Sequence, residues 1–177
     1  MSNLADIGAY NIMLIGFMGT GKSTVSRQLS KLLGYEEVDT DQLIVEKEGM
    51  PITDIFEKYG EDYFRTSESN TLIELQKRNK LLVSCGGGIV LRDENMKHMK
   101  SNGRIVLLTA RPETILERVK DSNVRPILNN NMNIEFISDL MDKRKDRYEK
   151  AADIIVSTDG KEVDEIADEI ITKLKQL

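Results

Sequence analysis

The chain has 177 residues and a formal net charge of −5. It is long enough to bury a full core, and no Pro-, Gly- or Ser-rich linker divides it, so we expect one domain over residues 1–177. The acidic balance gives no footprint for nucleic acid or an anionic membrane surface. One cysteine excludes an internal disulfide, and one histidine argues against a His/Cys metal cage. Without a signal-peptide pattern or a membrane-length apolar run, the sequence predicts a cytoplasmic protein.

The first predicted strand is the apolar run at residues 12–15, which leads into Gly-Phe-Met-Gly-Thr-Gly-Lys-Ser-Thr at residues 16–24. This segment fits G-x-x-x-x-G-K-[ST], the pattern of a phosphate-binding loop. Apolar residues at helical spacing follow as far as Gly34. Backbone N–H groups and the helix N-terminus would bind phosphate, Lys22 could bridge the outer phosphates, and Ser23 could ligate magnesium. The loop alone does not distinguish a motor, a switch and a small-molecule kinase.

Strands and helices alternate along the rest of the chain. We predict strands at residues 35–39, 81–85, 104–109 and 153–157, and helices at residues 41–48, 51–59, 61–79, 93–101, 112–119, 133–150 and 163–174. A polar, asparagine-rich segment at residues 120–132, broken by Pro126, is predicted to be a mobile loop. The alternation indicates a three-layer α/β domain with about five parallel strands. Ligands of such folds bind beyond the carboxyl ends of the strands.

Two aspartates follow the second predicted strand. Neither strand 81–85 nor strand 104–109 ends in the acidic residue that holds magnesium in motor-type ATPases, so that residue must come from elsewhere. Asp39 and Asp41 would point to the same side of an extended segment. Asp39 could hold magnesium, directly or through water, while Asp41 faces a substrate hydroxyl. Alternatively, Asp41 only caps a helix that begins at Gln42.

Two arginines lie on the apolar stripes of predicted helices. Arg65 and Glu68 are one turn apart on the stripe that continues through Leu72, and an arginine oriented by a carboxylate suits an anionic substrate group. An ordinary surface ion pair is the alternative. Arg144 lies seven and four residues after Ile137 and Leu140, so it points along their stripe. The alternative there is a side chain that snorkels to solvent.

Arg118 and Arg125 could reach a bound nucleotide when the polar loop closes. An arginine over transferring phosphates stabilises the charge of the transition state, and a closing loop excludes water. For Arg118, a solvated helix position is an equally good reading. Cys85 and His98 are assigned no role.

Taken together, these motifs resemble those of the shikimate kinase family over nearly the whole chain. The resemblance rests on the ordered set of residues 16–24, Asp39-Thr-Asp41, Gly60 to Arg65 with Glu68, Gly86-Gly-Gly88, Val124-Arg-Pro126 and Leu140 to Arg144. It implies strand order 2-3-1-4-5, a lid at residues 119–132, and transfer of the ATP γ-phosphate to the 3-hydroxyl of shikimate. It further implies ATP as co-substrate, Mg²⁺ as cofactor and a monomer.

The resemblance also implies the role of each site residue. Catalysis falls to Lys22, Asp41 and Arg125; ATP binding to Gly19, Thr20, Gly21, Lys22, Ser23, Thr24, Arg118 and Arg125; shikimate binding to Asp41, Arg65, Gly87, Gly88 and Arg144; and magnesium to Ser23 and Asp39. Two rival readings remain. One is a kinase for another small acid or nucleotide, such as gluconate or a nucleoside monophosphate. The other is a nucleotide-binding module without catalysis, which would have no need of an acceptor pocket.

Overall fold

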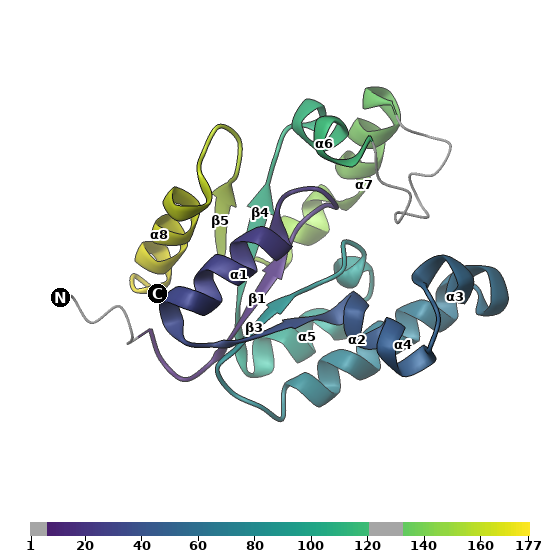
Figure 1. Ribbon diagram of the computed structural model, residues 1–177, viewed down its shortest axis with the longest axis horizontal. Helices are drawn as coiled ribbons and strands as arrows, with labels where there is room; N and C mark the ends of the chain where they lie inside the picture. The colour runs from purple at the N-terminus through teal and green to yellow at the C-terminus, as the bar shows by residue number, and fades with distance from the viewer. Residues whose placement is uncertain (1–6, 121–132) are drawn as a thin grey trace.

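A computed structural model describes residues 7–120 and 133–177 and contains one five-stranded parallel sheet (Figure 1). The strand order β2-β3-β1-β4-β5 is the one that the family resemblance implied. The strands are β1 (Asn11–Ile15), β2 (Glu36–Asp39), β3 (Leu81–Ser84), β4 (Gly103–Thr109) and β5 (Ile154–Ser157). The central strands β1 and β3 are buried along their whole length, as continuous apolar runs in a parallel sheet require.

Helices cover both faces of this sheet, which gives the predicted three layers (Figure 1). They are α1 (Lys22–Leu33), α2 (Thr40–Glu48), α3 (Ile52–Tyr59), α4 (Glu61–Leu75), α5 (Asp93–Ser101), α6 (Pro112–Val119), α7 (Ile134–Ala151) and α8 (Val163–Leu174), with a short 3-10 turn η1 (Ile89–Leu91) after β3. One face packs on α1 and α8, and the other on α4, α5, α6 and α7. In residues 7–120 and 133–177 no helix is both long and apolar enough to cross a membrane.

A smaller apolar cluster lies beside the sheet, where α2, α3 and α4 meet. It is built from Ile44, Ile55 and Phe64, one buried residue from each helix. The cluster holds α2 and the first turn of α4 together. It thereby fixes the helices that carry Asp41 and Arg65 relative to each other.

Two helical features differ from the sequence prediction by more than one residue, namely the end of α4 and the turn η1. The helix α4 ends at Leu75 rather than near residue 79. The side-chain amides of Asn11 and Asn102 both donate to the Arg78 carbonyl, at 2.9 Å each, and these tertiary bonds hold residues after Leu75 in a turn. Such bonds come from distant segments, so helical periodicity could not reveal them. The turn η1 was not predicted either, because three residues are too few for a periodic signal.

Candidate active site

The phosphate loop connects β1 to α1 and closes on itself. Gly21 takes the left-handed conformation, with φ of 98°, at the position just before α1, where a residue with a side chain would be strained. The Lys22 ammonium donates to the carbonyls of Gly16 and Phe17, at 2.8 and 3.1 Å. The Thr20 hydroxyl also donates to the Phe17 carbonyl, at 2.9 Å. The loop therefore presents the start of a helix and a lysine at one rim, which is an anion-binding arrangement.

A cleft of about 1010 Å³ opens in front of this loop. Its walls include most of the residues that the sequence predicted for the site: Gly19, Gly21, Lys22, Ser23, Thr24, Asp39, Asp41, Gly87 and Arg118. Thr20, Arg65 and Arg144 are instead buried behind its surface. Arg125 and most of the predicted lid at residues 119–132 lie outside the described residues. The part of the lid that is described, Val119 and Lys120, closes the helix α6.

The two aspartates share the cleft but occupy different backbone settings. Asp39 ends β2, opposite Ser84, and caps α2 by accepting a hydrogen bond from the Gln42 backbone N–H at 3.0 Å. Asp41 lies inside the first turn of α2. The expectation that both belong to one extended segment is therefore wrong, and so is the alternative in which Asp41 caps the helix. Asp39 already supplies the N-cap of α2, so Asp41 is not needed for it. The position of Asp41 in the first turn of the helix sets the direction of its side chain.

Arg65 and Glu68 form a buried ion pair. The Arg65 Nη1 donates to Glu68 Oε1 at 2.7 Å, and its Nη2 donates to Glu61 Oε1 at 3.1 Å. Arg65 is 6% exposed and Glu68 is fully buried, so the surface ion pair considered as an alternative is wrong. A buried pair adds little to stability after its desolvation cost, but it holds the guanidinium in one orientation.

The environment of Glu68 shows which charges gather behind the cleft. The pKa of Glu68 is raised to about 7, chiefly by burial and to a smaller extent by the Asp41 carboxylate, against the opposing charges of Arg65 and Arg144. Glu68 Oε2 accepts no hydrogen bond within residues 7–120 and 133–177. Two carboxylates and two guanidinium groups thus form one cluster, which we call the charged cluster (Asp41, Arg65, Glu68, Arg144).

The glycines after β3 separate the charged cluster from the phosphate loop. A Cβ at Gly88 would lie 2.1 Å from Arg65 Nη1, and one at Gly86 would lie 2.6 Å from Asp41 Oδ1. Only glycine lets the backbone approach these side chains so closely. A Cβ at Gly87 would lie 3.6 Å from Arg144 Nη1, a buried donor without an acceptor in the described part of the chain. The snorkelling alternative for Arg144 is wrong, since its side chain is 4% exposed.

Arg118 is exposed, and its guanidinium lies against the phosphate loop. Its Nη1 donates to the Gly19 carbonyl at 2.9 Å and to the Thr158 hydroxyl at 3.3 Å. The Thr158 oxygen is also 2.9 Å from the Thr20 carbonyl, so the segment after β5 reaches the same loop. The side chain of Arg118 is therefore solvated, as one reading expected, but it also bonds the phosphate loop. Thr158 is a contact that the sequence did not reveal.

Comparisons with known proteins point to one family. The shikimate kinase family model matches residues 18–175. A shikimate kinase of Thermodesulfovibrio yellowstonii is 42% identical over 167 residues, which cover 94% of this chain and 96% of that protein. The chain belongs to the shikimate kinase family. Members of this family are ATP-dependent kinases that phosphorylate a hydroxyl group, and this is the activity of the chain.

Solved structures agree with this membership. A shikimate kinase of Acinetobacter baumannii, determined in complex with shikimate, superposes with a TM-score of 0.88 at 36% identity and covers 92% of this chain and 91% of its own. A gluconokinase of Sinorhizobium meliloti superposes with a TM-score of 0.58 at 16% identity, covering 94% and 92% of the two chains. At that identity the likeness shows a shared fold only. The gluconate kinase alternative is thus not favoured.

Sequence reasoning missed two further residues that touch the predicted site. The Thr40 hydroxyl accepts from the Gly86 backbone N–H at 3.0 Å, and the Tyr148 hydroxyl donates to the Gly87 carbonyl. Thr40 lies between Asp39 and Asp41 in the sequence, and the sequence prediction assigned roles to the two carboxylates only. Tyr148 is four residues after Arg144 and hence on the same helix face. That spacing was a usable signal, although it does not reveal which carbonyl the hydroxyl meets.

Proposed function

We propose that this enzyme transfers the γ-phosphate of ATP to the 3-hydroxyl of shikimate, giving shikimate 3-phosphate and ADP. The observation that carries the proposal is the position of residues 86–88, which have the phosphate loop on one side and the charged cluster on the other. Donor and acceptor sites thus meet in one cleft, which in-line phosphoryl transfer requires. The Acinetobacter baumannii relative, whose structure contains shikimate, supports the choice of acceptor.

On the donor side, the phosphate loop would bind the triphosphate. Backbone N–H groups of Gly19, Thr20 and Gly21, with Ser23 and Thr24 at the start of α1, are suited to phosphate oxygens. Lys22 would exchange its two carbonyl acceptors for the outer phosphates. Arg118 would flank the nucleotide, and Arg125 would stabilise the charge on the transferring group.

Mg²⁺ fits the donor set on this side of the cleft. The Ser23 hydroxyl and the Asp39 carboxylate both line the cleft, and hard oxygen ligands with several waters are what Mg²⁺ takes. When bound, Mg²⁺ would neutralise charge on the β- and γ-phosphates. Asp39 can hold it directly or through water while one carboxylate oxygen keeps the cap of α2.

On the acceptor side, Arg65 and Arg144 would bind the shikimate carboxylate, with Gly87 and Gly88 lining the pocket. The free hydrogen-bonding capacity of Arg144 Nη1 supports this role, because a carboxylate would supply the missing acceptor. Asp41 would accept or orient the proton of the 3-hydroxyl. The mechanism is chiefly positioning and charge stabilisation.

The remaining expectations from the sequence belong to the same proposal. Residues 1–177 would form one domain with a lid at residues 119–132, and the enzyme would act as a cytoplasmic monomer. Sedimentation of the protein with and without ATP would test the monomer, for which one species of the mass of a single chain is expected.

A panel of acceptors tests the proposed substrate against its rivals. ADP formation would be measured with shikimate, gluconate and nucleoside monophosphates at equal concentrations. We expect only shikimate to raise the rate markedly, because its carboxylate and ring hydroxyls match two arginines and Asp41. Preferred turnover of gluconate or a nucleotide would overturn the substrate assignment. ATP binding without turnover of any acceptor would favour the non-catalytic module.

A further inference from the structure

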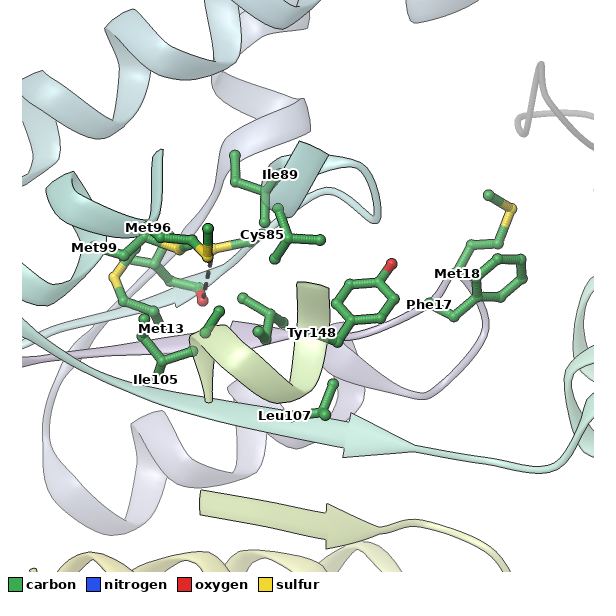
Figure 2. Close-up of a cluster of buried hydrophobic side chains, with 14 of the residues drawn as sticks. Met13, Phe17, Met18, Cys85, Ile89, Met96, Met99, Ile105, Leu107 and Tyr148 are labelled. Carbon is green, nitrogen blue, oxygen red and sulfur yellow. Dashed lines mark hydrogen bonds between the residues drawn. The ribbon is translucent and has the colours of Figure 1, made fainter. Parts of the chain in front are cut away.

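Tyr148 is a buried polar residue on α7 to which the mechanism assigns no role. It is 5% exposed and packs with the apolar cluster between the sheet and α7, where Figure 2 shows its ring between Leu107 of β4 and Phe17 of the phosphate loop. A tyrosine in such a cluster costs more to bury than a phenylalanine unless its hydroxyl finds a partner. The hydrogen-bond partner of the Tyr148 hydroxyl therefore indicates what this buried tyrosine does.

The Tyr148 hydroxyl donates to the carbonyl of Gly87. Gly87 lies where the two halves of the cleft meet: a Cβ there would be 3.5 Å from the Met18 backbone nitrogen, 3.6 Å from Arg144 Nη1 and 3.7 Å from the Gly16 carbonyl oxygen. A hydrogen bond to this carbonyl fixes the peptide that faces both the phosphate loop and the arginine. Without the hydroxyl, this partly buried carbonyl would lose its side-chain donor.

The same hydroxyl also interacts with Arg144. Burial raises the pKa of Tyr148, and the nearby Arg144 guanidinium opposes that shift, since its positive charge favours negative charge on the phenol oxygen. A phenol has one proton and two lone pairs, so it can donate to Gly87 while it accepts from Arg144. One oxygen atom thus connects a glycine and an arginine that the proposed function places around the acceptor.

We propose that Tyr148 is a positioning residue for the acceptor, which holds the Gly87 peptide and the Arg144 guanidinium in the geometry that binds the substrate carboxylate. This inference rests on the proposed function, because it takes Gly87 and Arg144 as acceptor contacts. Among the described residues, those that line the cleft do not include Tyr148, so it is expected to act through Gly87 and Arg144.

Tyr148→Phe removes only the hydroxyl and keeps the ring in the core. The matched control is Tyr35→Phe: Tyr35 is also 5% exposed, and its hydroxyl donates to the Gly8 carbonyl at 2.6 Å, but it packs on the opposite face of the sheet. Steady-state kinetics would give KM for shikimate and for ATP, with assays run well below the unfolding midpoint of each variant. Calorimetry would give the Kd for shikimate directly.

We expect Tyr148→Phe to raise KM and Kd for shikimate about tenfold, the effect of one lost buried hydrogen bond, and to leave KM for ATP within about twofold of the wild type. Tyr35→Phe should leave both KM values unchanged even if it lowers the unfolding midpoint as much. An equal rise for both substrates, or equal kinetics in the two variants, would overturn the positioning role. A wild type that fails to turn over shikimate would overturn the proposed function and this inference with it, so the two failures are distinguishable.

Discussion

Glu68 is the residue whose protonation most directly reports on the charged cluster. Its pKa in the folded protein is about 7, against 4.5 for an unperturbed glutamate, so the folded state binds the proton more tightly than the unfolded state. Protonation of Glu68 therefore stabilises the fold fully below about pH 4.5. This contribution to the free energy of unfolding is lost as the pH rises from about 4.5 to about 7. Above that pH, Glu68 causes no further change in stability.

Comparison with Glu68→Gln isolates that contribution. The free energy of unfolding of the wild type minus that of Glu68→Gln should fall by up to about 3 kcal/mol between pH 4.5 and 7, because glutamine does not titrate. Urea unfolding at several pH values measures it. Glu74→Gln, on the exposed side of the same helix, is the matched control and should show no such trend. A difference that grows with pH would mean that the ion pair with Arg65 outweighs burial.

Gly88 tests the contact between the glycine turn and Arg65. In Gly88→Ala the new methyl would meet the Arg65 guanidinium at 2.1 Å, and that guanidinium is held by Glu68 and Glu61. The arginine must shift, so we expect KM for shikimate to rise roughly tenfold or more while KM for ATP stays near that of the wild type.

A double-mutant cycle with Arg65→Ala supplies the control for Gly88→Ala. Once Arg65 is truncated, the methyl group has nothing to displace, so the second substitution should add little to the first. Full additivity of the two effects on KM would contradict a shared cause.

At the scale of single elements, α2 combines a cap and a proposed metal ligand in one side chain. Asp39→Asn keeps a good N-cap but removes the charge, so it should change the free energy of unfolding by less than about 0.5 kcal/mol while strongly weakening magnesium-dependent turnover. Asp39→Ala should lose both the cap and the charge, so it should weaken turnover and also lower the free energy of unfolding by about 1 kcal/mol. Unfolding curves and magnesium titrations of the rate measure the two effects. Normal turnover in Asp39→Asn at low magnesium would remove Asp39 from the metal site.

The elements show how far local patterns determine this fold. Apolar runs predicted the buried strands, and the glycine after residue 33 predicted the end of α1, which the left-handed Gly34 confirms. The start of α2 and the end of α4 were misplaced because each depends on a particular hydrogen bond. Asp39 rather than Asp41 caps α2, and the side chains of Asn11 and Asn102 donate to a carbonyl far from them in sequence.

In the candidate site too, some residues could be predicted from the sequence and some contacts could not. Residues within one motif, such as Lys22 and Ser23, or on one helical stripe, such as Arg65, could be predicted because spacing determines where they point. Contacts between elements could not: Thr158 reaches the phosphate loop from the end of β5, and Tyr148 reaches Gly87 from α7. Such contacts depend on how the elements pack, which one sequence does not specify.

At the scale of the whole molecule, Cys85 offers a probe of global opening. It is the only cysteine of the chain, it is 1% exposed, and burial raises its pKa well above the usual range. A thiol reagent should therefore react orders of magnitude more slowly with the folded protein than with the unfolded protein, and ATP should slow the reaction further by stabilising the fold. Absorbance of the released reagent group follows the rate. Fast labelling without denaturant would show that the core around Cys85 opens locally.

The cleft places a phosphate-donor site and an anion-binding acceptor site on either side of residues 86–88, and the central claim is that phosphate passes between them. The direct measurement is ADP formation by the wild type with and without shikimate, together with identification of the product by phosphorus NMR. We predict one ADP per shikimate consumed, a phosphate on the 3-hydroxyl, and no shikimate-dependent ADP from an identically prepared Lys22→Ala variant. A folded, ATP-binding wild type whose ADP formation does not respond to shikimate would contradict the account.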